Sequence, residues 1–131
     1  MNPGQPISRP MGLTILAVAN FVVGVFFGIV ALMTLVLLAN GAEATGTLIT
    51  SFVAGLVLAM GAILSALGYL RLSASRGKTL GTVFGLLVLV YVAHGLIITG
   101  SSNIVYVVMA LLGIGNTSLV NTVYKDVFSE E

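Results

Sequence analysis

The stretch RLSASRGK (residues 71–78) decides how this chain is organised, because it places three cations between two apolar halves. The chain has 131 residues, of which 58% are hydrophobic and 7% are charged. A soluble domain carries about 25% charged residues, so the polar surface that such a domain needs is missing here. We therefore expect lipid to cover most of the surface, with residues 71–78 forming a loop at the membrane boundary.

Outward from this loop, four uncharged apolar runs predict four transmembrane helices. They cover residues 11–39, 47–70, 79–99 and 104–123. About 20 apolar residues span a hydrocarbon core, and runs of this length without strict alternation exclude a membrane β-barrel. The first run is about twice as long as the apolar core of a cleavable signal peptide, so we expect it to stay in the membrane. The predicted fold class is all-α, an integral membrane four-helix bundle.

All five cations fall on one side of this predicted bundle. They are Arg9, Arg71, Arg76, Lys78 and Lys125. Short loops rich in lysine and arginine stay in the cytoplasm. We therefore expect both termini to be cytoplasmic in a multi-pass protein of the cell membrane, with residues 1–10 as a mobile tail and residues 124–131 as a second tail. An odd number of spans would break this five-to-none distribution.

Tyrosines near the ends of the runs support the same threading. Tyr69 and Tyr124 fall at the expected cytoplasmic boundary and Tyr106 at the outer one. Amphipathic rings are stabilised at the interface between lipid and water. We therefore interpret these three side chains as interfacial anchors.

Small residues spaced four apart predict the faces on which helices pack closely. Gly24 and Gly28 share one face of the first run, and Gly81 and Gly85 share one face of the third. Small residues allow two backbones to approach, so that dispersion and weak Cα–H···O contacts accumulate. These faces either pack inside the four-helix bundle or form the seam of a homo-oligomer, and intramolecular packing is the interpretation that we favour.

Polar side chains inside the runs are few. His94 has no acidic or cysteine partner nearby in sequence. It fits either a neutral imidazole bonded to a neighbour or a proton-responsive or ligand-binding group. Asn20 and Asn116 fall at similar depth on the first and last helices, and an unpaired amide in hydrocarbon is costly. We therefore predict that these two amides hydrogen-bond to each other; the alternatives are local backbone bonds or the wall of a polar path.

None of the four apolar runs contains aspartate, glutamate, lysine or arginine. The chain has no cysteine, one histidine and one aspartate, which leaves no candidate catalytic set, metal site or cofactor site. The net charge of +1 gives nucleic-acid binding no electrostatic basis. Small multidrug exporters, which have a similar size, depend on a glutamate in their first helix, whereas Glu43 lies in a loop.

Two function hypotheses follow for this chain, and neither is enzymatic. The first is an accessory or scaffold component that acts through helix packing with itself or a larger membrane complex. The alternative is a minimal oligomeric channel or transporter. A polar stripe that continues through all four helices would favour the alternative.

Both ends of the chain carry a sequence resemblance. The opening RPMGLTILA (residues 9–17) resembles the Arg-Pro-x-Gly-x-Thr-x-Leu-Ala opening of a family of small uncharacterised prokaryotic membrane proteins with about four spans. The ending YKDVF (residues 124–128) is similar to a compressed form of the ends of these proteins. The resemblance implies a multi-pass prokaryotic membrane protein, and it carries over no activity.

Overall fold

The elements of this chain are all helices in the computed structural model, which describes residues 9–101 and 103–128. They are α1 (Met11–Ala39), α2 (Gly46–Leu70), η1 (Ala74–Thr79), α3 (Leu80–Thr99), α4 (Ile104–Ile114) and η2 (Gly115–Leu119). The π-helical segment η1 runs directly into α3, and η2 continues α4. The all-α fold class is therefore confirmed.

Three helical stretches are long and apolar enough to cross a membrane. They are α1, α2 and the combined stretch Ala74–Thr99. The last helical stretch, Ile104–Leu119, is also apolar but shorter. The composition and length of these helices match the expectation of a protein that lies in a membrane.

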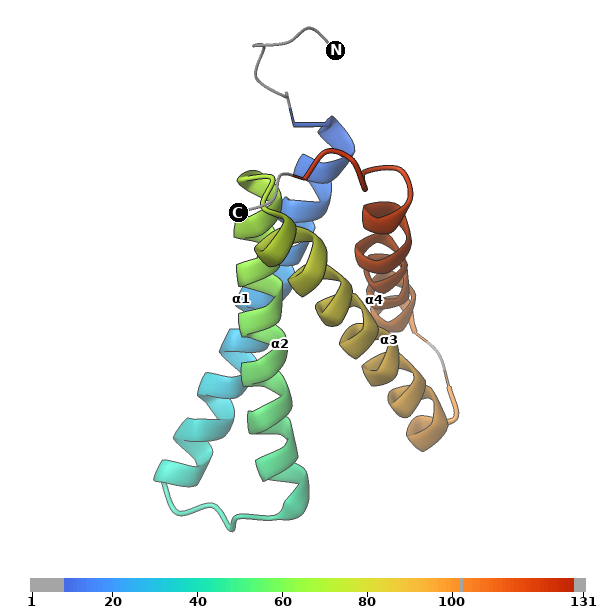
Figure 1. Cartoon of the computed structure of the whole chain (residues 1–131). Coiled ribbons are helices and arrows are strands. Elements are labelled where there is room, and N and C mark those ends of the chain that lie inside the picture. Colours follow the sequence, from blue (N-terminus) through green and yellow to red (C-terminus); the bar gives the residue numbers. More distant parts are fainter. Residues whose placement is uncertain (1–8, 102, 129–131) are drawn as a thin grey trace, which may run out of the picture.

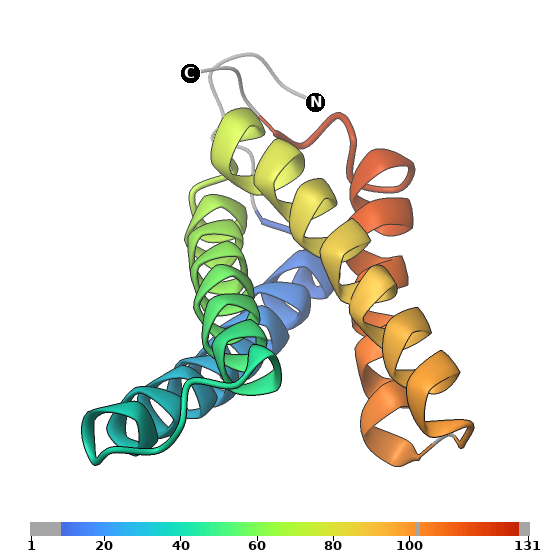
Figure 2. The same cartoon turned by 90° about the horizontal axis from the view of Figure 1, so that it is seen from below.

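The helices form two antiparallel hairpins, α1–α2 and α3–α4, that meet at one end and diverge at the other (Figure 1). The view from below shows the same separation of the two hairpins (Figure 2). We call the end that holds the α2–η1 turn and the end of α4 the basic end, and the end that holds the turns after α1 and α3 the loop end. The bundle is closed at the basic end and open at the loop end.

The closed half contains the most deeply buried side chains. The largest of those below 2% exposure include Leu13, Tyr69, Phe84, Val88 and Val120. They come from all three long helical stretches and from the end of the last one. Apolar side chains elsewhere on the helices are largely exposed, as expected where lipid replaces water as the surrounding medium.

The loop between the second and third helices is shorter than the predicted loop of residues 71–78. The third helix begins at Ala74 rather than residue 79, because Ser73 caps it: the Ser73 hydroxyl accepts a bond from the Arg76 amide at 3.3 Å. Leu72 has a left-handed backbone with φ of 53°, which turns the chain sharply between α2 and η1. Only residues 71–73 remain as a turn.

The last helix is shorter than the predicted span of residues 104–123. The Asn116 amide donates to the carbonyl of Leu112 at 2.8 Å, and the Thr117 hydroxyl donates to that of Gly113 at 2.8 Å. Such side-chain bonds compete with the regular ladder and accompany its widening to the π-helical η2. The helix then closes in a turn, in which the Tyr124 amide donates to the carbonyl of Leu119 at 3.0 Å.

The described parts of both tails pack on the basic end. Arg9 Nη1 donates to the carbonyl of Leu70 at 2.7 Å, which places a cation at the C-terminus of α2, where the helix dipole favours it. The rings of Phe128 and Tyr69 lie 5.9 Å apart between centroids. Residues 1–8 and 129–131 of the predicted tails lie outside the described residues.

Candidate functional site

Four polar side chains meet inside the closed half of the bundle, and we call them the polar cluster: Asn20 of α1, Ser65 and Tyr69 of α2, and Asn116 of η2. The two amides exchange hydrogen bonds, from Asn20 Nδ2 to Asn116 Oδ1 at 2.7 Å and from Asn116 Nδ2 to Asn20 Oδ1 at 2.8 Å. The predicted amide pair is therefore present. It joins the first helix to the last.

The hydrogen-bonding capacity of Asn116 is used completely. Its Oδ1 accepts from Asn20 and from the Tyr69 hydroxyl at 2.5 Å, and its Nδ2 donates to Asn20 and to the carbonyl of Leu112. An asparagine side chain offers two donors and about two acceptor positions. Asn20 Nδ2 donates its second hydrogen bond to Ser65 Oγ at 3.0 Å. Within the described chain, the Asn116 side chain therefore has no free hydrogen-bonding position.

The polar cluster is sealed from the surroundings. All four side chains are 0% exposed, and among the described residues no buried side-chain nitrogen or oxygen lacks a partner. Tyr69 was predicted to be an interfacial anchor, and this is wrong: its ring is inside the core, and its hydroxyl bonds to Asn116. The sequence signal that would have indicated it is the spacing of Ser65 and Tyr69, four apart on one face of α2.

The glycine ladder of the third helix packs inside the molecule. A Cβ added to Gly85 would lie 2.9 Å from the carbonyl oxygen of Gly113 and 2.9 Å from the Cβ of Asn116, so α3 and α4 touch backbone to backbone there. A Cβ at Gly81 would overlap the Tyr69 hydroxyl. These two glycines therefore permit the contacts that surround the polar cluster.

The glycines of the first helix differ from each other. A Cβ at Gly24 would lie 3.3 Å from the carbonyl oxygen of Ala59 and 2.7 Å from a side-chain carbon of Ile63, so Gly24 packs against α2. At Gly28 the nearest atom would be the Cβ of Ala59, at 4.0 Å, which is an ordinary contact. Three of the four candidate packing glycines are thus buried within one chain.

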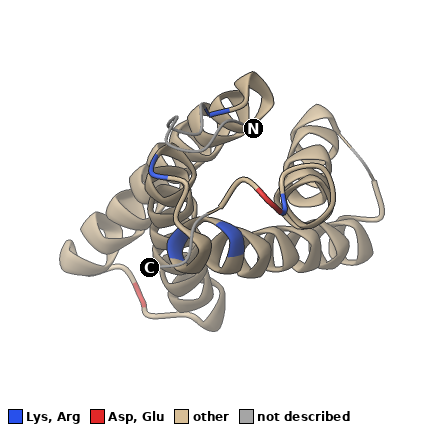
Figure 3. Cartoon of the chain, turned by 45° about the horizontal axis from the view of Figure 1, so that its top comes forward, with Lys and Arg blue, Asp and Glu red and all other residues tan. Residues whose placement is uncertain are grey.

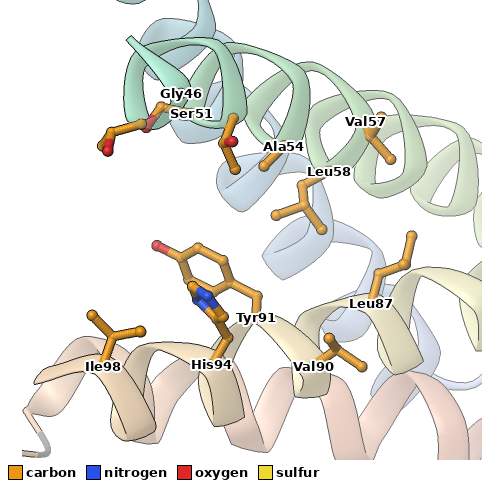
Figure 4. Close-up of a pocket in the computed structure, with 12 residues that line it drawn as sticks. Gly46, Ser51, Ala54, Val57, Leu58, Leu87, Val90, Tyr91, His94 and Ile98 are labelled. Atoms are coloured by element: carbon orange, nitrogen blue, oxygen red, sulfur yellow. The ribbon is translucent and has the colours of Figure 1, made fainter. Parts of the chain in front are cut away.

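His94 lies away from the polar cluster, in a groove between the loop-end halves of α2 and α3 (Figure 4). The groove has a volume of about 890 Å³ and is mostly apolar. We call it the α2/α3 groove. Tyr91, which was not among the predicted site residues, lies beside His94, and its ring packs edge-on against Phe27 of α1 at 5.6 Å between centroids.

An apolar layer separates the α2/α3 groove from the polar cluster. The layer consists of Phe27 on α1, Leu58 on α2, which also lines the groove, and Val88 on α3, none of them more than 4% exposed. In the described part of the chain, therefore, no polar stripe runs from one end of the molecule to the other. The three intramembrane candidates fall into two separate places, with Asn20 and Asn116 together and His94 apart.

The predicted topology-setting cations gather at the basic end, where Figure 3 shows the lysines and arginines. The chain around them is partly helical, because Arg76 and Lys78 lie in η1 and Arg71 caps α2. The acidic Glu43 lies in the turn after α1, at the loop end. Asp126, the other described acidic residue, follows Lys125 at the basic end, so only the cations are confined to one end of the molecule.

Comparison with known proteins adds no family: no protein-family model, curated protein or solved structure matches this chain.

Proposed function

We propose that this protein is a non-enzymatic membrane component, an accessory or scaffold that acts through contacts of its helices with a larger membrane complex or a second copy. The observation that carries the proposal is the sealed polar cluster. It joins the two hairpins at the basic end, and no polar stripe crosses the part of one copy that is described.

The junction between the hairpins supports a scaffold because the polar cluster bonds α1, α2 and η2 to one another. Gly24, Gly81 and Gly85 make their close contacts within the chain, and the buried side-chain polar atoms of the described residues are all bonded within it. The remaining helix surface is apolar and open, and α1 exposes bulky side chains along its length, Phe21 and Phe26 among them at 50% and 55%. Such a surface is available to lipid or to partner helices, which pack through van der Waals contact in a bilayer.

The alternative function is a minimal channel or transporter assembled from several copies. The apolar layer between the polar cluster and the α2/α3 groove weighs against conduction through one copy. A pore would then have to form between copies. A purified homo-oligomer that conducts a solute across vesicle membranes would support this alternative function.

Site-specific photo-crosslinking combined with purification in mild detergent tests the proposal. Azidophenylalanine replaces Phe21 or Phe26, which are exposed, and in a matched control it replaces Phe84, which is 1% exposed. We expect a stoichiometric protein adduct from the exposed sites and none from the buried one. Adducts to lipid alone from both exposed sites, together with a monomer after purification, would contradict the accessory role.

A further inference from the structure

Five hydrogen-bonding side chains face the α2/α3 groove without using their capacity. They are Thr47, Thr50 and Ser51 of α2, and Tyr91 and His94 of α3. In the part of the chain that the structure describes, none of them takes part in a side-chain hydrogen bond. Polar groups in a membrane protein are costly when they find no partner.

The unused hydroxyls of α2 contrast with the threonines on the other helices. The hydroxyls of Thr34, Thr82, Thr99 and Thr117 all donate to the carbonyl four residues earlier, at 2.7 to 2.8 Å. This local bond is the ordinary way to satisfy a hydroxyl in an apolar helix. The hydroxyls in the groove make no such bond, so they are free to bind a molecule in the groove.

The polar groups gather at one end of the groove, and its other walls are apolar. Thr47 and Ser51 lie in the first six residues of α2, and His94 lies five residues before the end of α3 at Thr99. At 1.5 Å per residue, His94 is about 7.5 Å from that end. Further in, Val57, Leu87 and other apolar side chains form the walls (Figure 4). A head-and-tail molecule matches this distribution.

The charged residues at the loop end indicate which kind of head group the groove would accept. Among the described residues, the lysines and arginines lie at the basic end, and the loop end carries only Glu43. No lysine or arginine lines the groove, so no permanent cation is placed there to pair with a phosphate. The hydroxyl groups and the imidazole ring of these five side chains can donate or accept hydrogen bonds. They therefore match an uncharged head that carries a hydroxyl and carbonyl oxygens.

We propose that the α2/α3 groove binds a membrane lipid with an uncharged glycerol-ester head, of the diacylglycerol kind. Its hydroxyl and ester oxygens bond to Thr50, Ser51 and His94, and the upper part of its chains lies along the apolar walls. The groove opens between diverging hairpins (Figure 1), so the lipid enters sideways and the rest of its chains stay in the bilayer. A volume of about 890 Å³ is within the range of small-molecule sites, roughly 300–1,000 Å³. The lipid site stands independently of the accessory role proposed above.

Photolabelling of the full chain in phosphatidylcholine nanodiscs tests this site. The probe is a diacylglycerol with a photoreactive group in one acyl chain, and labelled peptides are mapped by mass spectrometry. We expect labels concentrated on peptides of the loop-end halves of α2 and α3, and competition by unlabelled diacylglycerol but not by anionic phosphatidylglycerol. Equal competition by both lipids, or labels spread evenly over the apolar helices, would overturn the proposal.

A double variant tests the role of the hydroxyls. Thr50→Val with Ser51→Ala removes two hydroxyls from the groove, and we expect labelling to fall by about eightfold, as the loss of two average membrane hydrogen bonds implies. The matched control is Thr99→Val, at the same end but bonded to the carbonyl of Gly95 and outside the groove, which should label like the parent. Equal labelling of both variants would overturn the proposal, provided that their unfolding temperatures match.

Crosslinking from inside the α2/α3 groove distinguishes a lipid from the other molecules that could occupy it. Azidophenylalanine at Tyr91 places a crosslinker in the groove, where a diacylglycerol adduct on mass analysis supports the proposal. A covalent dimer or an adduct to another protein would show that a second copy or a partner helix fills the groove, and this would overturn it.

Discussion

Asn116 is the residue on which the closed half of the molecule depends, because it connects α1, α2 and its own helix through one side chain. Its Oδ1 accepts from Tyr69, whose hydroxyl has no other partner. We predict that Tyr69→Phe lowers the free energy of unfolding by about 0.5–1.5 kcal/mol, since the ring stays and one hydrogen bond is lost. Denaturant unfolding in mild detergent measures the change.

The matched control for this change is Tyr124→Phe. Tyr124 is half-buried near the same end, and its hydroxyl makes no hydrogen bond within the described chain. The control should unfold like the parent. A loss of stability equal in the two variants would show that the hydroxyl of Tyr69 contributes nothing specific to the polar cluster.

The amide pair gives a second prediction at the residue scale. Asn20→Leu and Asn116→Leu each leave one amide or hydroxyl without its partner, so each single change should be destabilising. The double change should cost less than the sum of the two, because it removes both halves of the reciprocal bond. Membrane hydrogen bonds average about 0.6 kcal/mol, so the coupling should be modest. Strict additivity would contradict a direct interaction.

At the scale of the elements, the long apolar runs predicted α1 and α2 to within a residue, because hydrophobic length is a strong signal. The start of the third helix was missed because Ser73 caps it from inside a basic stretch. The splay of the two hairpins was not predictable. Small residues such as Gly24 and Gly85 show where helices touch, whereas the angle between hairpins depends on bulky side chains that meet only in three dimensions.

The candidate site was likewise predicted only in part. The pairing of Asn20 with Asn116 followed from equal depth and from the cost of a lone amide in hydrocarbon. Tyr69 was assigned to the interface because it lies near a helix end, and only the tertiary fold shows that the C-terminal segment with Phe128 covers it. The α2/α3 groove could not be predicted from the sequence, since its polar residues come from two different helices and lie at least 40 positions apart.

The glycines allow a prediction about the contact between α3 and α4. Gly85→Ala should lower the unfolding temperature, because its Cβ would lie 2.9 Å from the backbone of Gly113, and overpacking of this kind costs about 1–3 kcal/mol. Gly28→Ala is the control, since the nearest atom there is 4.0 Å away. Alanine is the better helix former, so the control should be neutral or slightly stabilising. Thermal unfolding in detergent compares the two, and an equal loss would contradict the close packing.

At the scale of the whole molecule, the cations lie at the end where the two hairpins meet. The lysines and arginines lie at the end where the hairpins are closed, and the open end carries only Glu43 among the described residues. If the basic end lies in the cytoplasm, the α2/α3 groove opens toward the outer leaflet. The predicted orientation in the membrane therefore also decides which leaflet supplies the lipid.

Cysteine labelling tests this threading, and the chain suits the method because it contains no cysteine of its own. Ala44→Cys and Ser101→Cys lie in exposed turns at the loop end, and Ser75→Cys is exposed at the basic end. A membrane-impermeant maleimide should label the first two in intact cells, and the third only after the membrane is permeabilised, because lysine- and arginine-rich segments stay inside. Labelling of Ser75→Cys in intact cells would reverse the orientation. Labelling of Ala44→Cys but not Ser101→Cys would mean that the shorter hairpin α3–α4 does not cross the membrane, and the five-to-none charge distribution would then need another cause.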